Sequence, residues 1–257
     1  MKFEEMINKV INCDCYEMIK NIPDKSIDLV YIDIPYLYSG YHKNKTNYKK
    51  MVKDETVEEI KKITNGIDYS IFDELCRVLK KTNIFIWCSK EQILYLLDYF
   101  VNVKKCHFDI ITWHKTNPTP LANNTFLPDT EYCLNFREKG VELSGQYNLK
   151  FKYYISPINT NDKDKFNHPT IKPLQFVKNH INLSTKPNDI VLDCFCGSGT
   201  TCVACKETGR RFIGMEINKE YYEIAQKRIN GITANGQMSM MFNDKGEPLN
   251  DWIWNIR

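Results

Sequence analysis

The chain has 257 residues, 42% of them hydrophobic, so it can bury the core of one α/β domain. It shows neither a charged start followed by an apolar run nor a stretch of about 18 apolar residues, which predicts no signal peptide, no membrane span and a cytoplasmic location. The net charge of +3 is too small to identify a partner by itself.

Apolar periodicity in the first half of the chain predicts strands and helices in turn. The expected strands are 10–13, 27–32, 84–87, 108–113 and 132–136. The expected helical segments are 16–21, 57–80 with a break at Gly66, and 91–101.

Between the expected strands 108–113 and 132–136, and again from there to about residue 166, the pattern becomes irregular, rich in Pro, Asn and Lys, and then order returns. The expected elements are helix 174–183, strand 190–192, helix 200–208, strand 212–216 and helix 219–229. Strands that alternate with helices predict an α/β fold with a doubly wound, mostly parallel sheet.

Residues 191–201 read Val-Leu-Asp-Cys-Phe-Cys-Gly-Ser-Gly-Thr-Thr. We expect Asp193 to end a strand, Gly197 and Gly199 to form a tight turn, and Thr200 to open a helix whose free N–H groups face a ligand. Glu216 ends the next strand, where an acidic residue can meet ribose hydroxyls. The layout indicates an adenosine-type cofactor. A nicotinamide-dependent oxidoreductase shares it, but its fingerprint has three glycines.

A second motif, Asp33-Ile34-Pro35-Tyr36, directly follows an apolar run. The Asp33 carboxylate and the Ile34 carbonyl can accept both protons of an exocyclic base amine, which leaves the nitrogen lone pair free to react. Tyr36 offers a ring on which a base extruded from a duplex can stack. The alternative interpretation is a simple strand ending.

Together and in this order, the two motifs resemble those of the beta-type S-adenosylmethionine-dependent DNA amino-methyltransferases. The turn matches the family form Asp-x-Phe-x-Gly-Ser-Gly-Thr, which adds Phe195 and Ser198 to the implied cofactor contacts. The family tetrapeptide is usually Asp-Pro-Pro-Tyr. Here Ile34 replaces the first proline, and Pro35 still confines it to extended conformations.

Three further segments are similar to family motifs. Residues 168–173, His-Pro-Thr-Ile-Lys-Pro, resemble the motif that holds the methionine end of the cofactor, which implies cofactor contacts for His168, Thr170 and Lys172, with Lys172 pairing with the cofactor carboxylate. Asp14 stands where relatives carry Gly-Asp and would accept from the adenine amino group. Residues 111–118, with Lys115, resemble a strand and loop near the target base.

The motif order resembles the circularly permuted, seven-stranded methyltransferase sheet with a small irregular target-recognition insertion. The implied division is 1–117 for the catalytic half, 118–167 for target recognition, 168–230 for the cofactor half and 231–257 for a C-terminal tail.

Residues 34–53 contain no acidic side chain, and their lysines and tyrosines follow Tyr36 directly. Lysines neutralise phosphates and tyrosines stack on bases, so we predict a segment that grips double-stranded DNA rather than a merely solvated loop. The predicted DNA contacts are Tyr38, Tyr41, Lys43, Lys45, Lys49, Lys50 and Lys115.

The resemblance implies a site-specific DNA methyltransferase that modifies adenine N6, because Asp33 occupies a position where cytosine-N4 enzymes more often have Ser. Cytosine-N4 methylation and a catalytically silent DNA-binding relative are the alternatives. A cognate restriction endonuclease and a second copy of the chain are the implied protein partners. Cys194, Cys196, Cys202 and Cys205 lack a second Cys/His pair in zinc-site register, so we predict buried thiols and no metal.

Overall fold

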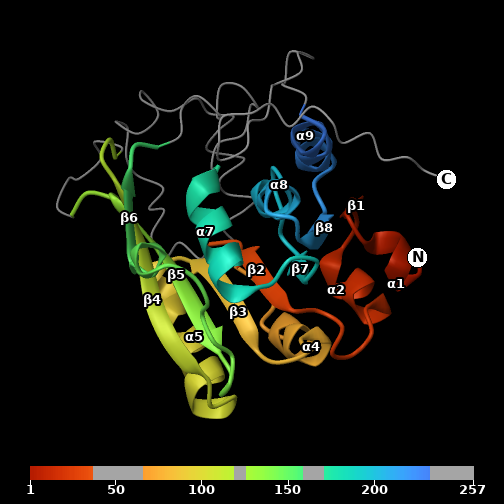
Figure 1. Ribbon diagram of the computed structural model, residues 1–257, viewed down its shortest axis with the longest axis horizontal. Helices are drawn as coiled ribbons and strands as arrows, with labels where there is room; N and C mark the ends of the chain where they lie inside the picture. The colour runs from red at the N-terminus through yellow and green to blue at the C-terminus, as the bar shows by residue number, and fades with distance from the viewer. Residues whose placement is uncertain (37–65, 119–125, 159–170, 232–257) are drawn as a thin grey trace, which may run out of the picture.

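The computed structural model describes residues 1–36, 66–118, 126–158 and 171–231 (Figure 1). They form an eight-stranded sheet in the order β1-β8-β7-β2-β3-β5-β4-β6, with helices on both faces. The sheet is mostly parallel, and β5 alone among the described strands runs antiparallel to its neighbours. The doubly wound α/β prediction is confirmed. The expectation of seven strands is wrong, because β6 adds an eighth.

The seven predicted strands all form, with ends within a few residues of those expected. The strands are β1 (Lys9–Asn12), β2 (Leu29–Asp33), β3 (Asn83–Cys88), β4 (His107–Lys115), β5 (Thr130–Arg137), β6 (Tyr153–Ser156), β7 (Ile190–Asp193) and β8 (Arg211–Glu216).

The helices also follow the predicted pattern in the described segments, with α1 and η4 as additions. They are α1 (Phe3–Met6), α2 (Cys15–Met18), η1 (Ile19–Asn21), α4 (Ile71–Val78), η2 (Lys90–Gln92), α5 (Ile93–Leu97), η3 (Asp98–Val103), η4 (Tyr147–Leu149), α7 (Leu174–Ser184), α8 (Thr200–Glu207) and α9 (Lys219–Ile229). Within these segments, no helix is both long and apolar enough to cross a bilayer.

Side chains that alternate along β2 fill two separate cores. Val30 and Ile32 face the core that α1, α4, α5 and η3 cover, whereas Leu29 and Tyr31 face the core that α7, α8 and α9 cover. All four side chains are buried, as expected for a central strand of a parallel sheet with helices on both faces.

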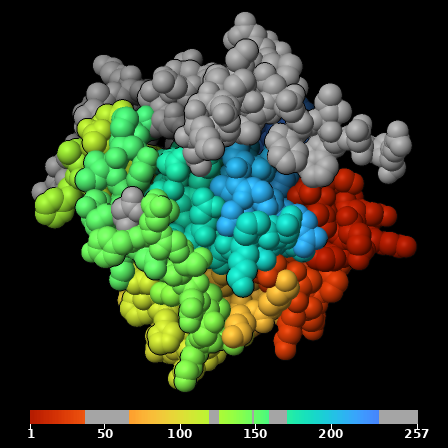
Figure 2. All heavy atoms as spheres, in the orientation of Figure 1, coloured from red at the N-terminus to blue at the C-terminus, as the bar shows by residue number. Residues whose placement is uncertain are grey.

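The edge strand β6 lies inside the stretch expected to be irregular. Among the described strands it pairs with β4 alone, and both Tyr153 and Ile155 are exposed. Tyr154 points to the opposite face and stacks on Phe176 of α7 at 4.8 Å between ring centroids, so that β6 lies against α7 (Figure 2). With so few buried side chains, a short edge strand leaves almost no periodicity in the sequence.

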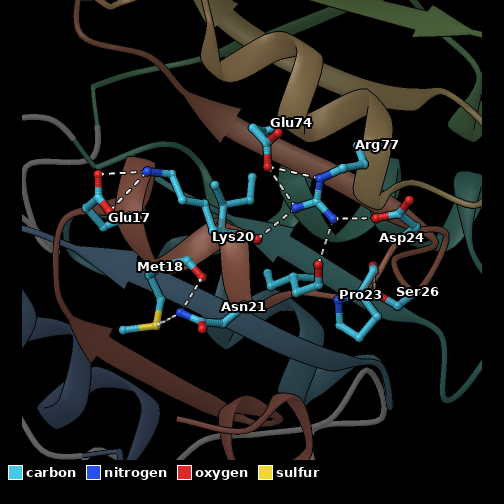
Figure 3. Close-up of polar contacts among 11 residues, drawn as sticks. Glu17, Met18, Lys20, Asn21, Pro23, Asp24, Ser26, Glu74 and Arg77 are labelled. Atoms are coloured by element: carbon cyan, nitrogen blue, oxygen red, sulfur yellow. Dashed lines mark hydrogen bonds and ion pairs between the residues drawn. The ribbon is translucent and has the colours of Figure 1, made fainter.

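Arg77 of α4 fixes the connection that leads into β2 (Figure 3). Its guanidinium donates to the carbonyls of Ile19 and Ile22 and forms ion pairs with Asp24 at 2.6 Å and Glu74 at 2.7 Å. The carbonyls of the first residue of η1 and of the residue after it thereby accept hydrogen bonds, which ties η1 and the turn that precedes β2 to α4.

The parallel strands β1, β8, β7, β2 and β3 are consecutive neighbours, so their carboxyl ends meet at one edge of the sheet. Ligands of open α/β sheets bind at this edge. The two sequence motifs end β2 and β7, which places Asp33 and Asp193 on neighbouring strands.

Candidate active site and cofactor-binding site

The glycine turn between β7 and α8 has the conformation that its sequence predicts. Asp193 is buried at the end of β7 and its Oδ1 accepts a hydrogen bond from the Phe195 N–H at 3.1 Å. Gly197 and Gly199 have φ of +50° and +80°, in the left-handed region that glycine tolerates. A Cβ on Gly199 would lie 2.9 Å from the Ala225 Cβ of α9, so close helix packing also requires glycine there.

Glu216 at the end of β8 is tied to this turn. Its Oε2 accepts from the Gly197 N–H and its Oε1 from the Asn218 N–H, both at 2.8 Å. Asp14, directly after β1, is exposed and caps α2 by accepting from the Tyr16 N–H at 2.8 Å. Three acidic side chains therefore lie at or just beyond the ends of three neighbouring strands, β1, β8 and β7, at the predicted cofactor edge.

Burial acts on the two inner carboxyls of this edge. It raises the pKa of Asp193 to about 7 and also raises the pKa of Glu216. Ser198 and Thr200, the other polar residues of the turn, accept hydrogen bonds from the buried Arg228 of α9 at 2.8 and 3.0 Å. Arg228 of α9 thus holds the turn through buried hydrogen bonds. A cationic ligand beside the turn would stabilise the ionised forms of Asp193 and Glu216.

Asp33 is the last residue of β2, and Ile34 makes one further backbone hydrogen bond to β3. The Ile34 N–H donates to the Trp87 carbonyl at 3.2 Å, and the Ile34 side chain is buried in the core beside α4, with 1% exposed. Core packing thus holds the backbone where the family has a ring-restricted proline. Among the described residues, Asp33 Oδ1 is buried and has no hydrogen-bond partner.

Lys172 reaches the tetrapeptide from the segment before α7. Its Nζ lies 2.7 Å from Asp33 Oδ2 and 2.9 Å from Glu131 Oε2, and it donates to the Tyr36 hydroxyl at 3.1 Å. Only 8% of the side chain is exposed. The structure therefore places Lys172 against Asp33, and its pairing with the cofactor carboxylate stays a prediction.

Glu131 of β5 continues this row of charges. Its Oε1 lies 2.7 Å from Lys115 Nζ, and its Oε2 accepts from the Tyr36 hydroxyl at 3.3 Å. Lys115 lies at the end of β4 with 16% of its side chain exposed, so the structure pairs it with Glu131, and DNA contact stays a prediction for it. Two carboxylates and two ammonium groups alternate as Asp33, Lys172, Glu131 and Lys115.

This alternation sets the ionisation of the group. Burial by itself raises the pKa of Glu131, but the ammonium groups of Lys172 and Lys115 outweigh it and hold that pKa at about 2. Burial raises the pKa of Asp33, and the adjacent Lys172 opposes the rise. The two carboxylates raise the pKa of Lys172 despite its burial, so this lysine stays protonated at neutral pH.

Sequence patterns did not indicate Glu131, nor Trp87 and Gln92 on the β3 side. The Trp87 ring centroid lies 5.1 Å from Lys172 Nζ, and Gln92 donates to the Pro35 carbonyl. Glu131 lies just before the predicted strand 132–136, where an acidic residue carries no signal of its own. Its place in the site follows only from the antiparallel pairing of β4 and β5, which sets Glu131 opposite Trp113.

Some predicted site residues lie outside the described segments. They are Tyr38, Tyr41, Lys43, Lys45, Lys49 and Lys50 of the basic segment, and His168 and Thr170.

The clustered cysteines near the turn pack in the core. Cys194, Cys196, Cys202 and Cys205 are buried and free. A Cβ on Gly214 of β8 would lie 2.7 Å from Cys202 Sγ, which shows how closely α8 approaches the sheet. Across the described ranges, no group of three or more His, Cys, Asp or Glu side chains is arranged to hold a metal ion.

An Asp-Ile-Pro-Tyr segment with a buried Ile34 lies beside a glycine turn at the carboxyl edge of a mostly parallel sheet, which is the arrangement that the resemblance implies for DNA amino-methyltransferases. The profile of the N6/N4 DNA methylase family matches residues 27–227. This chain therefore belongs to the N6/N4 DNA methylase family.

Relatives cover nearly the whole chain. The type II methyltransferase M2.LlaDCHI of Lactococcus lactis subsp. cremoris is 32% identical over 239 residues, 86% of this chain and 88% of that protein. The type II methyltransferase M.HinfI of Haemophilus influenzae is 28% identical over 255 residues, 90% of this chain and 70% of that protein.

Solved structures agree with the fold. The crystal structure of the M1.HpyAVI–SAM complex aligns with a TM-score of 0.63 at 28% identity, over 86% of this chain and 98% of that one. The cytosine-N4-specific PvuII DNA methyltransferase aligns with a TM-score of 0.65 at 16% identity, over 85% of each chain, which shows likeness of fold alone.

The cofactor of this chain is S-adenosylmethionine, and the described residues fit it. The buried carboxyls of Asp193 and Glu216 suit a ligand that carries a sulfonium charge and a ribose diol. Gly197, at φ +50°, has no side chain to hinder close approach to the backbone of the turn. These residues would hold the cofactor, together with the exposed carboxylate of Asp14.

Substitution of Gly197 by valine should remove S-adenosylmethionine binding. A β-branched residue at φ +50° is strained, and its side chain would occupy the ligand's space in the turn. Isothermal titration calorimetry should show a dissociation constant raised by about 10²-fold or more, roughly 3 kcal/mol. Gly209→Val is the matched control, because this glycine also has positive φ (+69°) but no atom lies within 4 Å of a Cβ placed there. Normal binding by Gly197→Val would contradict the cofactor assignment of the turn.

Proposed function

We propose that this protein is a site-specific DNA methyltransferase that transfers a methyl group from S-adenosylmethionine to adenine N6. The observation that carries the proposal is Asp33, whose Oδ1 is buried without a partner among the described residues and adjoins the Ile34 backbone at the carboxyl edge of the sheet.

The described residues support a mechanism in which acceptors activate the amine. An exocyclic amine is a poor nucleophile because its lone pair is delocalised into the ring. The Asp33 carboxylate and the Ile34 carbonyl accept its two protons, which favours a tetrahedral nitrogen with the lone pair free. Tyr36 stacks on the extruded base, and its hydroxyl is held by Lys172 at 3.1 Å and Glu131 at 3.3 Å.

The bound cofactor supplies a methyl group on a sulfonium sulfur, which leaves as a neutral thioether. The methylated nitrogen then carries one proton in excess. The Asp33 carboxylate, as one of the two acceptors, would receive that proton, or the proton would leave to water. No separate catalytic base is required, since the acceptor pair prepares the nucleophile before transfer.

The choice of adenine rests on Asp33 at the first position of the tetrapeptide, where the resemblance implies Ser more often in cytosine-N4 enzymes. Cytosine-N4 methylation is the alternative within the same mechanism. A silent DNA-binding relative is the alternative from another class, and the replacement of proline by Ile34 is the feature that raises it.

Nucleoside mass spectrometry on unmethylated DNA incubated with the purified protein and S-adenosylmethionine tests these alternatives. We expect N6-methyladenine. N4-methylcytosine would overturn the base assignment and keep the acceptor mechanism. The absence of any modified base would favour the silent relative.

The proposal includes double-stranded DNA as substrate, contacted by the basic segment of residues 38–53 and by the target-recognition segment, 118–167, between the catalytic and cofactor halves. A restriction endonuclease partner, a homodimer and a cytoplasmic location stay predictions.

A further inference from the structure

Gln92 lies in η2, directly after β3, and is completely buried. Its Oε1 accepts from the Ser89 N–H at 3.0 Å, and its Nε2 donates to the Pro35 carbonyl at 3.0 Å. One side-chain amide therefore bridges the ends of β2 and β3 at the point where the catalytic tetrapeptide leaves the sheet.

The register of β2 and β3 shows what this bridge prevents. Asp33 is paired with Trp87, and the Ile34 N–H donates to the Trp87 carbonyl at 3.2 Å. In a parallel ladder, the next bond would run from the Ser89 N–H to the Ile34 carbonyl. The Ser89 N–H donates instead to Gln92, so the ladder ends before it occupies that carbonyl.

We propose that Gln92 is a positioning residue for methyl transfer, an inference that rests on the proposed function. By diverting the Ser89 N–H and holding the Pro35 carbonyl, Gln92 keeps the Ile34 carbonyl available to accept a proton of the target amine. Ile34 stands where the family tetrapeptide usually has a proline, so no proline ring restrains the backbone there. The hydrogen bond from Gln92 to the Pro35 carbonyl supplies a restraint on the next residue.

Helix capping alone does not account for glutamine at this position. Ser89 and Gln92 form a capping box at the start of η2, and that motif needs only the side-chain oxygen of Gln92. Glutamate would serve it equally well. The donor to Pro35 is an additional contact that requires the amide nitrogen, and this difference separates a positioning role from a capping role.

The test compares the single-turnover rate of methyl transfer with the dissociation constants for S-adenosylmethionine and DNA. Gln92→Met should lower the rate by roughly 10²-fold, the effect expected when the reacting groups are misplaced by about 1 Å, with both dissociation constants within about threefold of wild type. Gln226→Met is the matched control. Gln226 lies in α9, and its side-chain amide donates a hydrogen bond to the Val10 carbonyl at 3.1 Å. The substitution removes this hydrogen bond and should keep the wild-type rate.

Gln92→Glu provides the second measurement. It keeps the capping oxygen but turns a carboxylate oxygen toward the Pro35 carbonyl, and only protonation restores a donor there. The ratio of its transfer rate to that of wild type should therefore rise as pH falls. Thermal unfolding of each variant checks that it is folded.

An active wild type with an equally active Gln92→Met would overturn the inference. So would a rate loss matched by an equal loss of cofactor binding, or a Gln92→Glu ratio that does not change with pH. A wild type that transfers methyl to neither adenine nor cytosine would instead overturn the proposed function, and the inference with it.

Discussion

Replacement of Asp33 by alanine should abolish methyl transfer, lowering its rate by roughly 10³-fold or more, while cofactor binding stays nearly intact. The substitution removes the side-chain acceptor of the amine. The cofactor turn follows another strand, β7, and is tied to β8. Lys172 keeps its ion pair with Glu131 at 2.9 Å, so the other charged groups of the site keep their partners.

Radiolabel transfer from S-adenosylmethionine to DNA measures the rate, and calorimetry measures cofactor binding in the same preparation. Asp33→Asn is an informative companion, because its amide keeps the shape but can present a donor to the amine. Asp98→Ala, at an exposed position of η3, serves as the control and should transfer at the wild-type rate. Wild-type turnover by Asp33→Ala would show that the acceptor mechanism is wrong.

Most of the fold was predictable because its signals are local. Buried strands such as β2 and β7 appear as apolar runs, and the turn from Asp193 to Thr200 is set by neighbouring residues. The parallel topology then brings strand ends together without further information. The strand β6 was not predicted, since it is four residues long and none of its side chains is fully buried, so no apolar run marks it.

The composition of the candidate site was less predictable. The motif predicted Asp33 and Tyr36 as site residues, but Glu131 comes from a distant strand and lies beside Tyr36 and Lys172 only through tertiary structure. Lys172 and Lys115 were predicted to contact ligands, and the structure pairs both with Glu131. The sequence shows which lysines belong to a motif. Which carboxylate each lysine pairs with depends on the positions of side chains from different strands.

Substitution of Lys172 by methionine should shift the acid limb of the transfer rate to higher pH. Asp33 must be ionised to accept the amine proton. Burial raises its pKa, and the Lys172 ammonium at 2.7 Å opposes that rise. Without the ammonium, the folded-state pKa of Asp33 rises further, so activity is lost at a higher pH as the solution is acidified. The expected displacement is about 1 to 3 pH units.

Transfer rates measured from about pH 6 to about pH 9 would show the variant weakest at the acid end and closest to wild type at the alkaline end. Lys178→Met is the matched control, because Lys178 is also a buried lysine paired with a carboxylate, Glu207 at 3.3 Å, and should leave the profile in place. Cofactor affinity distinguishes the two roles of Lys172. A dissociation constant for S-adenosylmethionine raised equally at every pH, with an unshifted acid limb, would mean that Lys172 serves the cofactor carboxylate and not Asp33.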